Sequence, residues 1–185
     1  MKKYKIIFAD LDDTLIETIS GDTFPKGVWD MKIKFNVLDK IKEIKPDYIL
    51  VVSNQGGIEK GFINELRFAY KINYIAICIR EYCDCGCVIE YCKYNDDNHN
   101  YRKPNIGLLN EMTETYIGDD FDYIKSVSLM IGDASGKEGQ WSDTDKKTAE
   151  NFGIDYIDVE DFVNSDITEL ESKIIYNFNS VKETE

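Results

Sequence analysis

The chain has 185 residues, about the length of one domain, and 43% of them are hydrophobic, which excludes an intrinsically disordered protein. Its formal net charge of −13 argues against a protein that clamps long stretches of nucleic-acid backbone, because such binding depends on many Lys and Arg contacts. A cleft that grips one terminal phosphate needs only a few local cations, so a nucleic-acid end stays compatible with this charge.

The first apolar run, residues 6–9, ends at Asp10 and is too short for the hydrophobic core of a secretory signal. No later segment approaches the ~18 consecutive apolar residues that a membrane span needs. The five cysteines are an odd number and four of them crowd into residues 83–92, which does not match the disulfide framework of a secreted domain. We therefore expect a soluble, cytoplasmic protein with no membrane partner.

Short apolar runs alternate with segments of helical spacing along the chain. The runs predict strands at residues 5–9, 48–52, 74–79, 127–131 and 154–157, and the spacing predicts helices near residues 37–44, 63–70, 108–116 and 142–152. Most of the strands are unbroken apolar runs, as in a parallel sheet that is covered on both faces. The pattern predicts an α/β fold with a Rossmann-like, doubly wound parallel sheet. We expect one domain over residues 1–178, a Cys-rich loop inserted at 83–103, and a disordered tail at 179–185.

Polar residues come at the ends of three predicted strands. Asp10 follows the first strand, Ser53 the second and Asp133 the fourth. Ligands of doubly wound sheets bind beyond the carboxyl ends of the strands. We therefore expect these three residues to meet at one edge of the sheet.

The strongest chemical signal is the segment Asp10-Leu11-Asp12-Asp13-Thr14. Asp10 and Asp12 can face one Mg²⁺ ion, the first through its side chain and the second through its carbonyl oxygen. The carboxylate of Asp10 can then attack phosphorus as a nucleophile, while Asp12 gives a proton to the leaving oxygen. The alternative is a solvated acidic turn, which is common in a chain with 35 acidic residues.

Three further short motifs follow along the chain. They are Ser53-Asn54-Gln55, Lys103 within Arg102-Lys103-Pro104, and Gly132-Asp133 with Asp145. Taken singly, each residue also fits a structural role, such as a turn, a surface lysine or a helix cap.

In this order and on these elements, the motifs resemble those of the haloacid dehalogenase superfamily, whose hallmark is Asp-x-Asp-x-Thr after the first strand. The resemblance covers residues 5–158 and implies a Mg²⁺-dependent phosphatase that forms a phospho-aspartate at Asp10. It also implies that Ser53, Asn54 and Lys103 bind the transferring phosphoryl group, and that Asp133 binds the Mg²⁺ ion with Asp145 supporting the metal from behind. The interval between Thr14 and Ser53 has no room for a helical cap domain. We expect the core fold of this superfamily with a small flap, no large cap and an open active site.

Residues 15–25 and 132–146 also resemble the matching segments of polynucleotide kinase 3′-phosphatases. Those enzymes remove a 3′-phosphate from DNA or RNA ends so that a ligase or polymerase can act. The resemblance implies a nucleic-acid 3′ end as substrate and a role in end repair. The sequence has no Gly-x-x-x-x-Gly-Lys-Ser/Thr motif, so we expect no kinase activity.

An alternative is a small-molecule phosphatase, because residues 54–58 also resemble the second motif of histidinol-phosphate and heptose-bisphosphate phosphatases. Those enzymes often hold zinc in a loop before the Lys-Pro motif. The same interval here offers enough ligands for a tetrahedral structural Zn²⁺ site, against the alternative of a loop of free thiols. These ligands are Cys83, Cys85, Cys87, Cys92 and His99.

A different class of protein uses similar residues. Phosphoacceptor receiver domains in signalling also combine acids with Thr or Ser and a Lys on a doubly wound sheet. Their acceptor Asp lies at the end of a later strand. No Asp follows the apolar run at residues 75–79, which disfavours a receiver.

Overall fold

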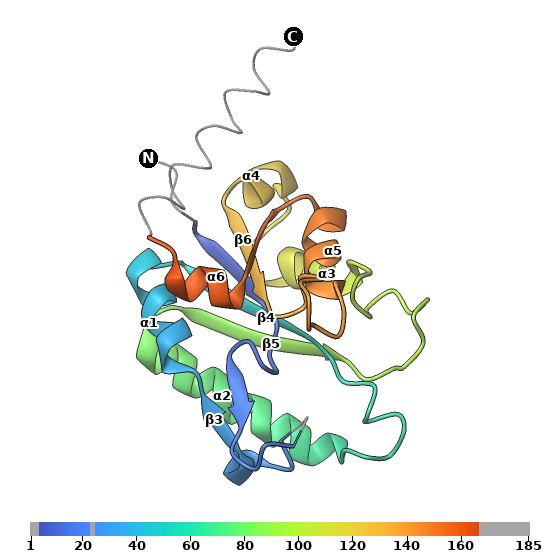
Figure 1. The fold of residues 1–185 in the computed structure, drawn as a ribbon. Coiled ribbons are helices and arrows are strands. Elements are labelled where there is room, and N and C mark those ends of the chain that lie inside the picture. Colours follow the sequence, from blue (N-terminus) through green and yellow to red (C-terminus); the bar gives the residue numbers. More distant parts are fainter. Residues whose placement is uncertain (1–3, 23–24, 167–185) are drawn as a thin grey trace.

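A computed structural model describes residues 4–22 and 25–166 and shows a central sheet with helices on both sides (Figure 1). Five parallel strands form this sheet in the order β5-β4-β1-β6-β7. The strands are β1 (Ile6–Ala9), β4 (Tyr48–Asn54), β5 (Gly86–Cys92), β6 (Ser128–Gly132) and β7 (Asp155–Asp158). The predicted α/β fold with a parallel sheet is therefore confirmed.

A small flap follows β1. It consists of the antiparallel pair β2 (Ile16–Thr18) and β3 (Met31–Ile33), with the short 3-10 helix η1 (Val28–Asp30) just before β3. Within residues 4–22 and 25–166 there is no large cap domain, as expected from the short interval between Thr14 and Ser53.

Two hydrophobic clusters lie on opposite faces of the sheet. The helices are α1 (Phe35–Ile44), α2 (Glu65–Cys83), α3 (Gly107–Tyr116), α4 (Phe121–Ser126), α5 (Thr144–Phe152) and α6 (Val159–Asn164). On one face Ile7 and Val51 pack with α1, α2 and α6, and on the other Phe8 and Val52 pack with α3, α4 and α5. Because successive strand residues point to opposite faces, both faces must be apolar, which explains the unbroken apolar runs.

One predicted strand is wrong. Residues 74–79 lie inside α2, which begins at Asn64, where the side chain accepts a hydrogen bond from the backbone N–H of Arg67 (3.0 Å). The buried residues of α2 recur at helical spacing, so the apolar run is the buried face of a helix joined to exposed neighbours. The buried apolar side chains are Phe68, Ile72, Ile75, Ala76, Ile79 and Cys83.

The predicted Cys-rich loop at 83–103 is wrong over part of its length. Cys83 ends α2, and residues 86–92 form β5, which pairs with β4 from Tyr48 to Asn54 and makes one edge of the sheet. The fifth strand of the sheet is thus β5 and not the segment at 74–79. The predicted tail at 179–185 lies outside the described residues. Within the described ranges, no helix combines the length and hydrophobicity needed to cross a bilayer.

Asp158, the last residue of β7, holds the loop between β6 and α5. Its carboxylate accepts hydrogen bonds from Ser135 Oγ (2.7 Å) and Gln140 Nε2 (2.7 Å) and lies 3.0 Å from Lys137 Nζ. It also caps α6 by accepting a hydrogen bond from the N–H of Glu160 (3.1 Å). Burial raises the pKa of Asp158, but these hydrogen bonds lower it more, so the pKa lies below its ordinary value.

We predict that Asp158→Asn lowers the free energy of unfolding at pH 7 by about 1–3 kcal/mol, because the half-buried donors of Ser135 and Gln140 lose a charged acceptor. A carboxyl whose pKa is lowered by folding stabilises the protein above its unfolded pKa of about 3.9. That stability is lost as the pH falls through the lower, folded value. Urea unfolding should therefore give a constant difference between wild type and variant down to about pH 5, and a shrinking one below about pH 4.

Asp161→Asn is the control, because Asp161 pairs with the same lysine (2.8 Å) from an exposed position. We expect it to change the free energy of unfolding by less than about 0.5 kcal/mol. An equal loss of stability in both variants would contradict the role given to Asp158.

Candidate active site

Three carboxylates meet at the carboxyl edge of the sheet. Asp10 directly follows β1, Asp133 directly follows β6, and Asp145 lies in the first turn of α5. One oxygen from each carboxylate lies within 4.8 Å of the other two. Among residues 4–22 and 25–166, no other three His, Cys, Asp or Glu side chains are spaced to hold one metal ion. We expected Asp10, Ser53 and Asp133 at the carboxyl edge of the sheet, and the three acids gather at this edge.

The backbone fixes this arrangement. β1 and β6 are neighbours, and the N–H of Asp10 donates a hydrogen bond to the carbonyl of Ile131 (3.1 Å). Asp145 reaches the group over Gly132, where any Cβ would clash with its carboxylate. The N–H of Ala134 donates to the same carboxylate (3.1 Å). From the sequence we expected Asp145 to support the metal from behind, and one of its carboxylate oxygens lies within 4.8 Å of an oxygen of each of the other two acids.

Lys103 lies between two of these acids. Its side chain is buried, with 4% of the residue exposed, and Nζ donates hydrogen bonds to the carboxylates of Asp10 and Asp145, the latter at 2.7 Å. Asn54 at the end of β4 fixes its backbone. The side-chain oxygen of Asn54 accepts from the N–H of Lys103 (2.9 Å), and its amide nitrogen donates to the Lys103 carbonyl (3.0 Å). Asn54 thus holds Lys103 in place, rather than pointing freely into the site.

The charges of this group are not balanced, since one ammonium faces three carboxylates. Burial raises the pKa of Asp10 well above its usual range, and although Lys103 opposes this, Asp145 and Asp133 add to the rise. Burial, together with Asp145, raises the pKa of Asp133 to about 6. Burial lowers the pKa of Lys103, but Asp10 and Asp145 raise it more, so Lys103 stays charged. Three oxygen donors with excess negative charge suit a hard divalent cation such as Mg²⁺.

The Asp12 side chain contacts residues outside the group of three carboxylates. One of its oxygens accepts a hydrogen bond from Gln55 Nε2 (2.6 Å), which also donates to Ser53 Oγ (2.8 Å). The other oxygen is buried 3.6 Å from Lys71 Nζ and has no hydrogen-bond partner among the described residues. Asp12 therefore lies between the cluster of three carboxylates and a neighbouring pocket that it lines.

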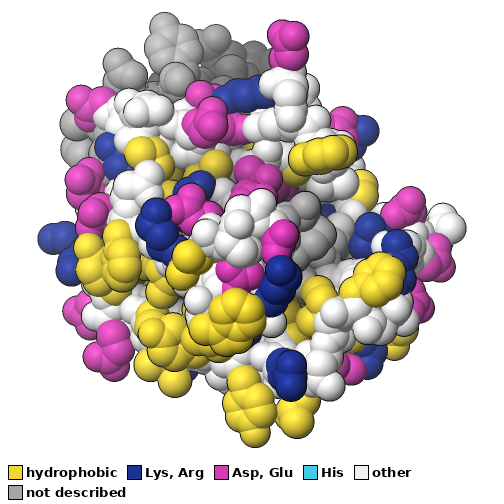
Figure 2. All heavy atoms as spheres, turned by 60° about the horizontal axis from the view of Figure 1, so that its bottom comes forward, with side chains coloured by type: hydrophobic (Ala, Val, Ile, Leu, Met, Phe, Trp, Pro, Cys, Tyr) yellow, Lys and Arg dark blue, Asp and Glu magenta, His cyan; other side chains and the backbone are white. Residues whose placement is uncertain are grey.

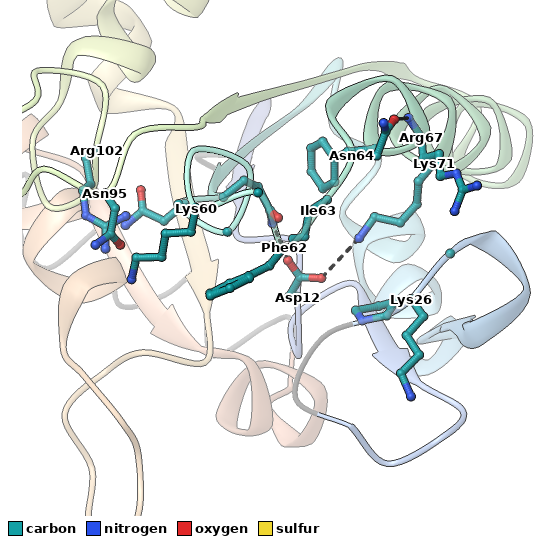
Figure 3. Close-up of a pocket in the computed structure, with 18 residues that line it drawn as sticks. Asp12, Lys26, Lys60, Phe62, Ile63, Asn64, Arg67, Lys71, Asn95 and Arg102 are labelled. Atoms are coloured by element: carbon teal, nitrogen blue, oxygen red, sulfur yellow. Dashed lines mark hydrogen bonds and ion pairs between the residues drawn. The ribbon is translucent and has the colours of Figure 1, made fainter.

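The pocket has a volume of about 650 Å³ and is bounded mainly by the flap, the loop after β4 and the start of α2 (Figure 3). Asp12 is the only acid among the described residues that line it. A chain with a net charge of −13 thus carries a locally cationic pocket next to Asp12. Its cationic residues are Lys26, Lys60, Arg67, Lys71 and Arg102.

Three residues that we did not assign to the site from the sequence also take part in it. Thr14 is fully buried and its Oγ1 donates to Asp133 (3.1 Å), and it completes the Asp-x-Asp-x-Thr motif that could have identified it. Gln55 directly follows Ser53 and Asn54, so its position in the second motif could have identified it as a site residue. Lys71 carried no such signal, because its burial depends on α2, where part of the segment was predicted as a strand.

The five predicted zinc ligands do not form one site. Cys87 and Cys92 lie on β5 but belong to the clusters on opposite faces of the sheet, because side chains alternate along a strand and their residue numbers differ by an odd number. Cys92 Sγ lies 3.7 Å from His99 Nδ1, whereas Cys83 and Cys85 pack with Cys87 on the other face. The described residues therefore give no support to a structural zinc site.

Comparisons with known proteins agree with this geometry. The family model described as polynucleotide kinase 3 phosphatase matches residues 5–163. A bifunctional polynucleotide phosphatase/kinase of Schizosaccharomyces pombe is 36% identical over 87% of this chain, but the chain spans only 38% of that protein. An uncharacterized 20.8 kDa protein of Autographa californica nuclear polyhedrosis virus is 29% identical over 90% of this chain and 89% of its own length.

A solved structure shares the fold. The D,D-heptose 1,7-bisphosphate phosphatase from B. bronchiseptica, complexed with magnesium and phosphate, superposes with a TM-score of 0.62. The match covers 82% of this chain and 78% of the solved chain, at 18% sequence identity. At this identity the likeness concerns the fold alone.

We predict that Lys103→Met lowers the free energy of unfolding by about 3–5 kcal/mol in the presence of EDTA, because it leaves two buried carboxylates without their counter-charge. Chelation keeps a bound cation from replacing the lysine. Lys32→Met is the control, since Lys32 is exposed and pairs with Glu17 (2.6 Å) on the flap. Chemical denaturation measures both variants, and a loss below about 1 kcal/mol for Lys103→Met would contradict its role in balancing the site.

Proposed function

Because the chain belongs to the polynucleotide kinase 3 phosphatase family, whose members are phosphatases of the haloacid dehalogenase type, we propose that it removes 3′-phosphates from polynucleotide ends with Mg²⁺ as cofactor. The observation that carries the proposal is the position of Asp12 between the group of Asp10, Asp133 and Asp145 and a cationic pocket. Membership of a phosphatase family argues against the alternative function of a signalling receiver.

The reaction takes two steps in this proposal. In the first, a carboxylate oxygen of Asp10 attacks phosphorus, the bond from phosphorus to the 3′ oxygen breaks, and Asp12 gives its proton to that oxygen. The product is a phospho-aspartate and a free 3′-hydroxyl. In the second step Asp12 takes a proton from water, the water oxygen attacks phosphorus, and the bond to Asp10 breaks to release phosphate.

The other residues of the site stabilise the transferring group. Asp10 and Asp133 would hold Mg²⁺ together with the carbonyl of Asp12, and Asp145 lies close enough to join them. When bound, this ion supplies positive charge to the phosphoryl oxygens. Lys103 Nζ donates to Asp10 and is placed to meet the phosphoryl group that Asp10 receives. We assign the Ser53 hydroxyl to a phosphoryl oxygen and give Asn54 the task of positioning Lys103.

The small-molecule alternative shares all of this chemistry, so the choice between substrates depends on the pocket. The solved neighbour acts on a heptose bisphosphate, and its likeness extends only to the fold. In this chain the described residues provide no large cap to close over a small ligand, and an open site admits a bulky end. The family match favours the polynucleotide.

We predict that Asp10→Asn abolishes phosphate release, whereas Asp12→Asn slows it by about 10²- to 10⁴-fold on a 3′-phosphorylated oligonucleotide. With p-nitrophenyl phosphate, whose leaving group needs no proton, the loss in Asp12→Asn should be much smaller. Asp13→Asn is the matched control, since Asp13 is the exposed neighbour in a left-handed turn (φ 59°) that Asn also adopts. Equal losses on both substrates would remove Asp12 from the role of acid.

The substrate assignment is tested with a panel at equal phosphate concentration. We expect kcat/KM to be highest for a 3′-phosphorylated oligonucleotide, lower for the same oligonucleotide with a 5′-phosphate, and lowest for sugar and amino-alcohol phosphates. EDTA should abolish release from every substrate, and Mg²⁺ should restore it. Preference for a sugar bisphosphate would favour the small-molecule alternative, and full activity in EDTA would contradict the cofactor.

A further inference from the structure

We propose that the pocket beside Asp12 holds the last nucleotides of a single-stranded end, with Lys60, Arg67 and Lys71 facing its phosphodiesters and Phe62 stacking on a base. This inference rests on the proposed function, because it places the leaving group of that reaction. It adds the polymer length and the strandedness that the enzyme selects.

The position of Asp12 gives the direction in which the substrate extends. The proton that Asp12 donates must reach the leaving oxygen, so the rest of the leaving group continues on the Asp12 side of Asp10. The side chain of Asp12 faces Gln55 and Lys71, and the pocket of about 650 Å³ opens there (Figure 3). A leaving group that continues beyond the terminal sugar therefore enters this pocket.

The charge of the pocket suits a leaving group that is itself an anion. Lys26 and Arg102 are already paired with Asp22 and Asp97, respectively. Lys60 and Arg67 are exposed on the pocket rim, and no acidic side chain in the described ranges lies within ion-pair distance of either. Unpaired cations on one side of a strongly acidic chain attract a phosphodiester backbone and disfavour a cationic amino alcohol.

Lys71 gives a second, independent indication of an anion. It is 5% exposed and reaches into the pocket from α2, where its ammonium lies 3.6 Å from Asp12 Oδ1 and 4.8 Å from the centre of the Phe68 ring. An ammonium has three N–H donors, and none of them meets a hydrogen-bond acceptor among the described residues. Because Lys71 lines the pocket, the phosphodiester next to the terminal sugar would supply acceptor oxygens to these donors and share the ammonium with Asp12.

Phe62 supplies a flat apolar surface at the pocket mouth. It is 82% exposed, yet its loop is held in place, because the Phe62 N–H donates to the carbonyl of Gly57 (2.9 Å) and Gly61 takes a left-handed turn (φ 74°). On the face that carries α2 and the flap, exposed hydrophobic side chains lie beside Lys and Arg side chains (Figure 2). Aromatic rings beside cations are the usual platform for unpaired bases, whose faces are free to stack.

The test removes two cations from the pocket rim and compares substrates of increasing length. The double variant Lys60→Gln/Arg67→Gln is measured beside the control Lys5→Gln/Lys45→Gln, which removes two exposed cations at the opposite, amino edge of the sheet. The substrates are a nucleoside 3′-phosphate, a nucleoside 3′,5′-bisphosphate and single-stranded oligonucleotides of increasing length with a 3′-phosphate. All are assayed with Mg²⁺.

For the wild type and the control we expect kcat/KM to rise by at least tenfold from the nucleoside 3′-phosphate to the oligonucleotides. In the rim variant this gain should disappear. The slope of log kcat/KM against log salt should also become less negative, by about 0.7 for each phosphate contact removed. A length dependence that survives in the rim variant overturns the proposal. So does a gain completed by the 3′,5′-bisphosphate, which would indicate a small bisphosphate substrate.

Phe62 tests the strandedness. Phe62→Ala should lower kcat/KM on the single-stranded oligonucleotide by roughly five- to hundredfold, the usual effect of removing one base-stacking ring, and Phe62→Tyr should restore it. A blunt duplex with a 3′-phosphate should be a poorer substrate for the wild type. Equal use of duplex and single strand, or no effect of Phe62→Ala, contradicts the stacking role.

These outcomes are separable from failure of the proposed function. If the wild type releases phosphate from none of the 3′-phosphorylated substrates but does so from a sugar phosphate, the proposed function is wrong and the pocket assignment is wrong with it. If it releases phosphate from all of them with equal kcat/KM, the reaction stands and only the pocket assignment is overturned.

Discussion

The ammonium of Lys103 between the carboxylates of Asp10 and Asp145 is the interaction on which the site depends. Carboxylates within 4.8 Å of one another and largely shielded from water repel, and without a nearby cation they would hold protons rather than charge. The lysine comes from a loop far from either acid in sequence, and the Asn54 side chain binds both sides of its backbone. The end of β4 thus positions the ammonium that faces Asp10, the proposed nucleophile at the end of β1.

This arrangement divides the edge of the sheet into two regions of opposite charge. On one side of Asp12 three carboxylates face a single ammonium, which suits a metal ion. On the other side lies a pocket in which cations outnumber acids. The overall charge of −13 describes neither region. A phosphate ester that bridges the two would place its phosphoryl group toward the metal side and its leaving group among the cations.

The sequence revealed the residues whose positions follow from strand ends. Asp10 and Asp133 come directly after apolar strands, and parallel strands end at one edge, so their meeting could be predicted without coordinates. The apolar run at 74–79 was wrongly predicted as a strand, because a short apolar segment fits a buried strand and a helix face equally well. That error concealed Lys71. Placing Cys87 and Cys92 in a loop likewise hid that strand geometry points them to opposite faces.

The parts of the site that were hardest to predict are also those that face the leaving group. The motifs contain the proposed nucleophile, the proposed acid and the carboxylates proposed to bind the metal, and a solved structure at 18% identity shares the fold. The pocket walls come instead from the flap, the loop after β4, the first turns of α2 and the segment after β5, and Asp12 is the only one of the proposed catalytic acids that lines them. A phosphoryl group is the same on every monoester, so the residues that bind it carry no information about the rest of the substrate. Selectivity must therefore reside in walls such as these, whose charges and exposed rings differ from one phosphatase to another while the chemistry stays fixed.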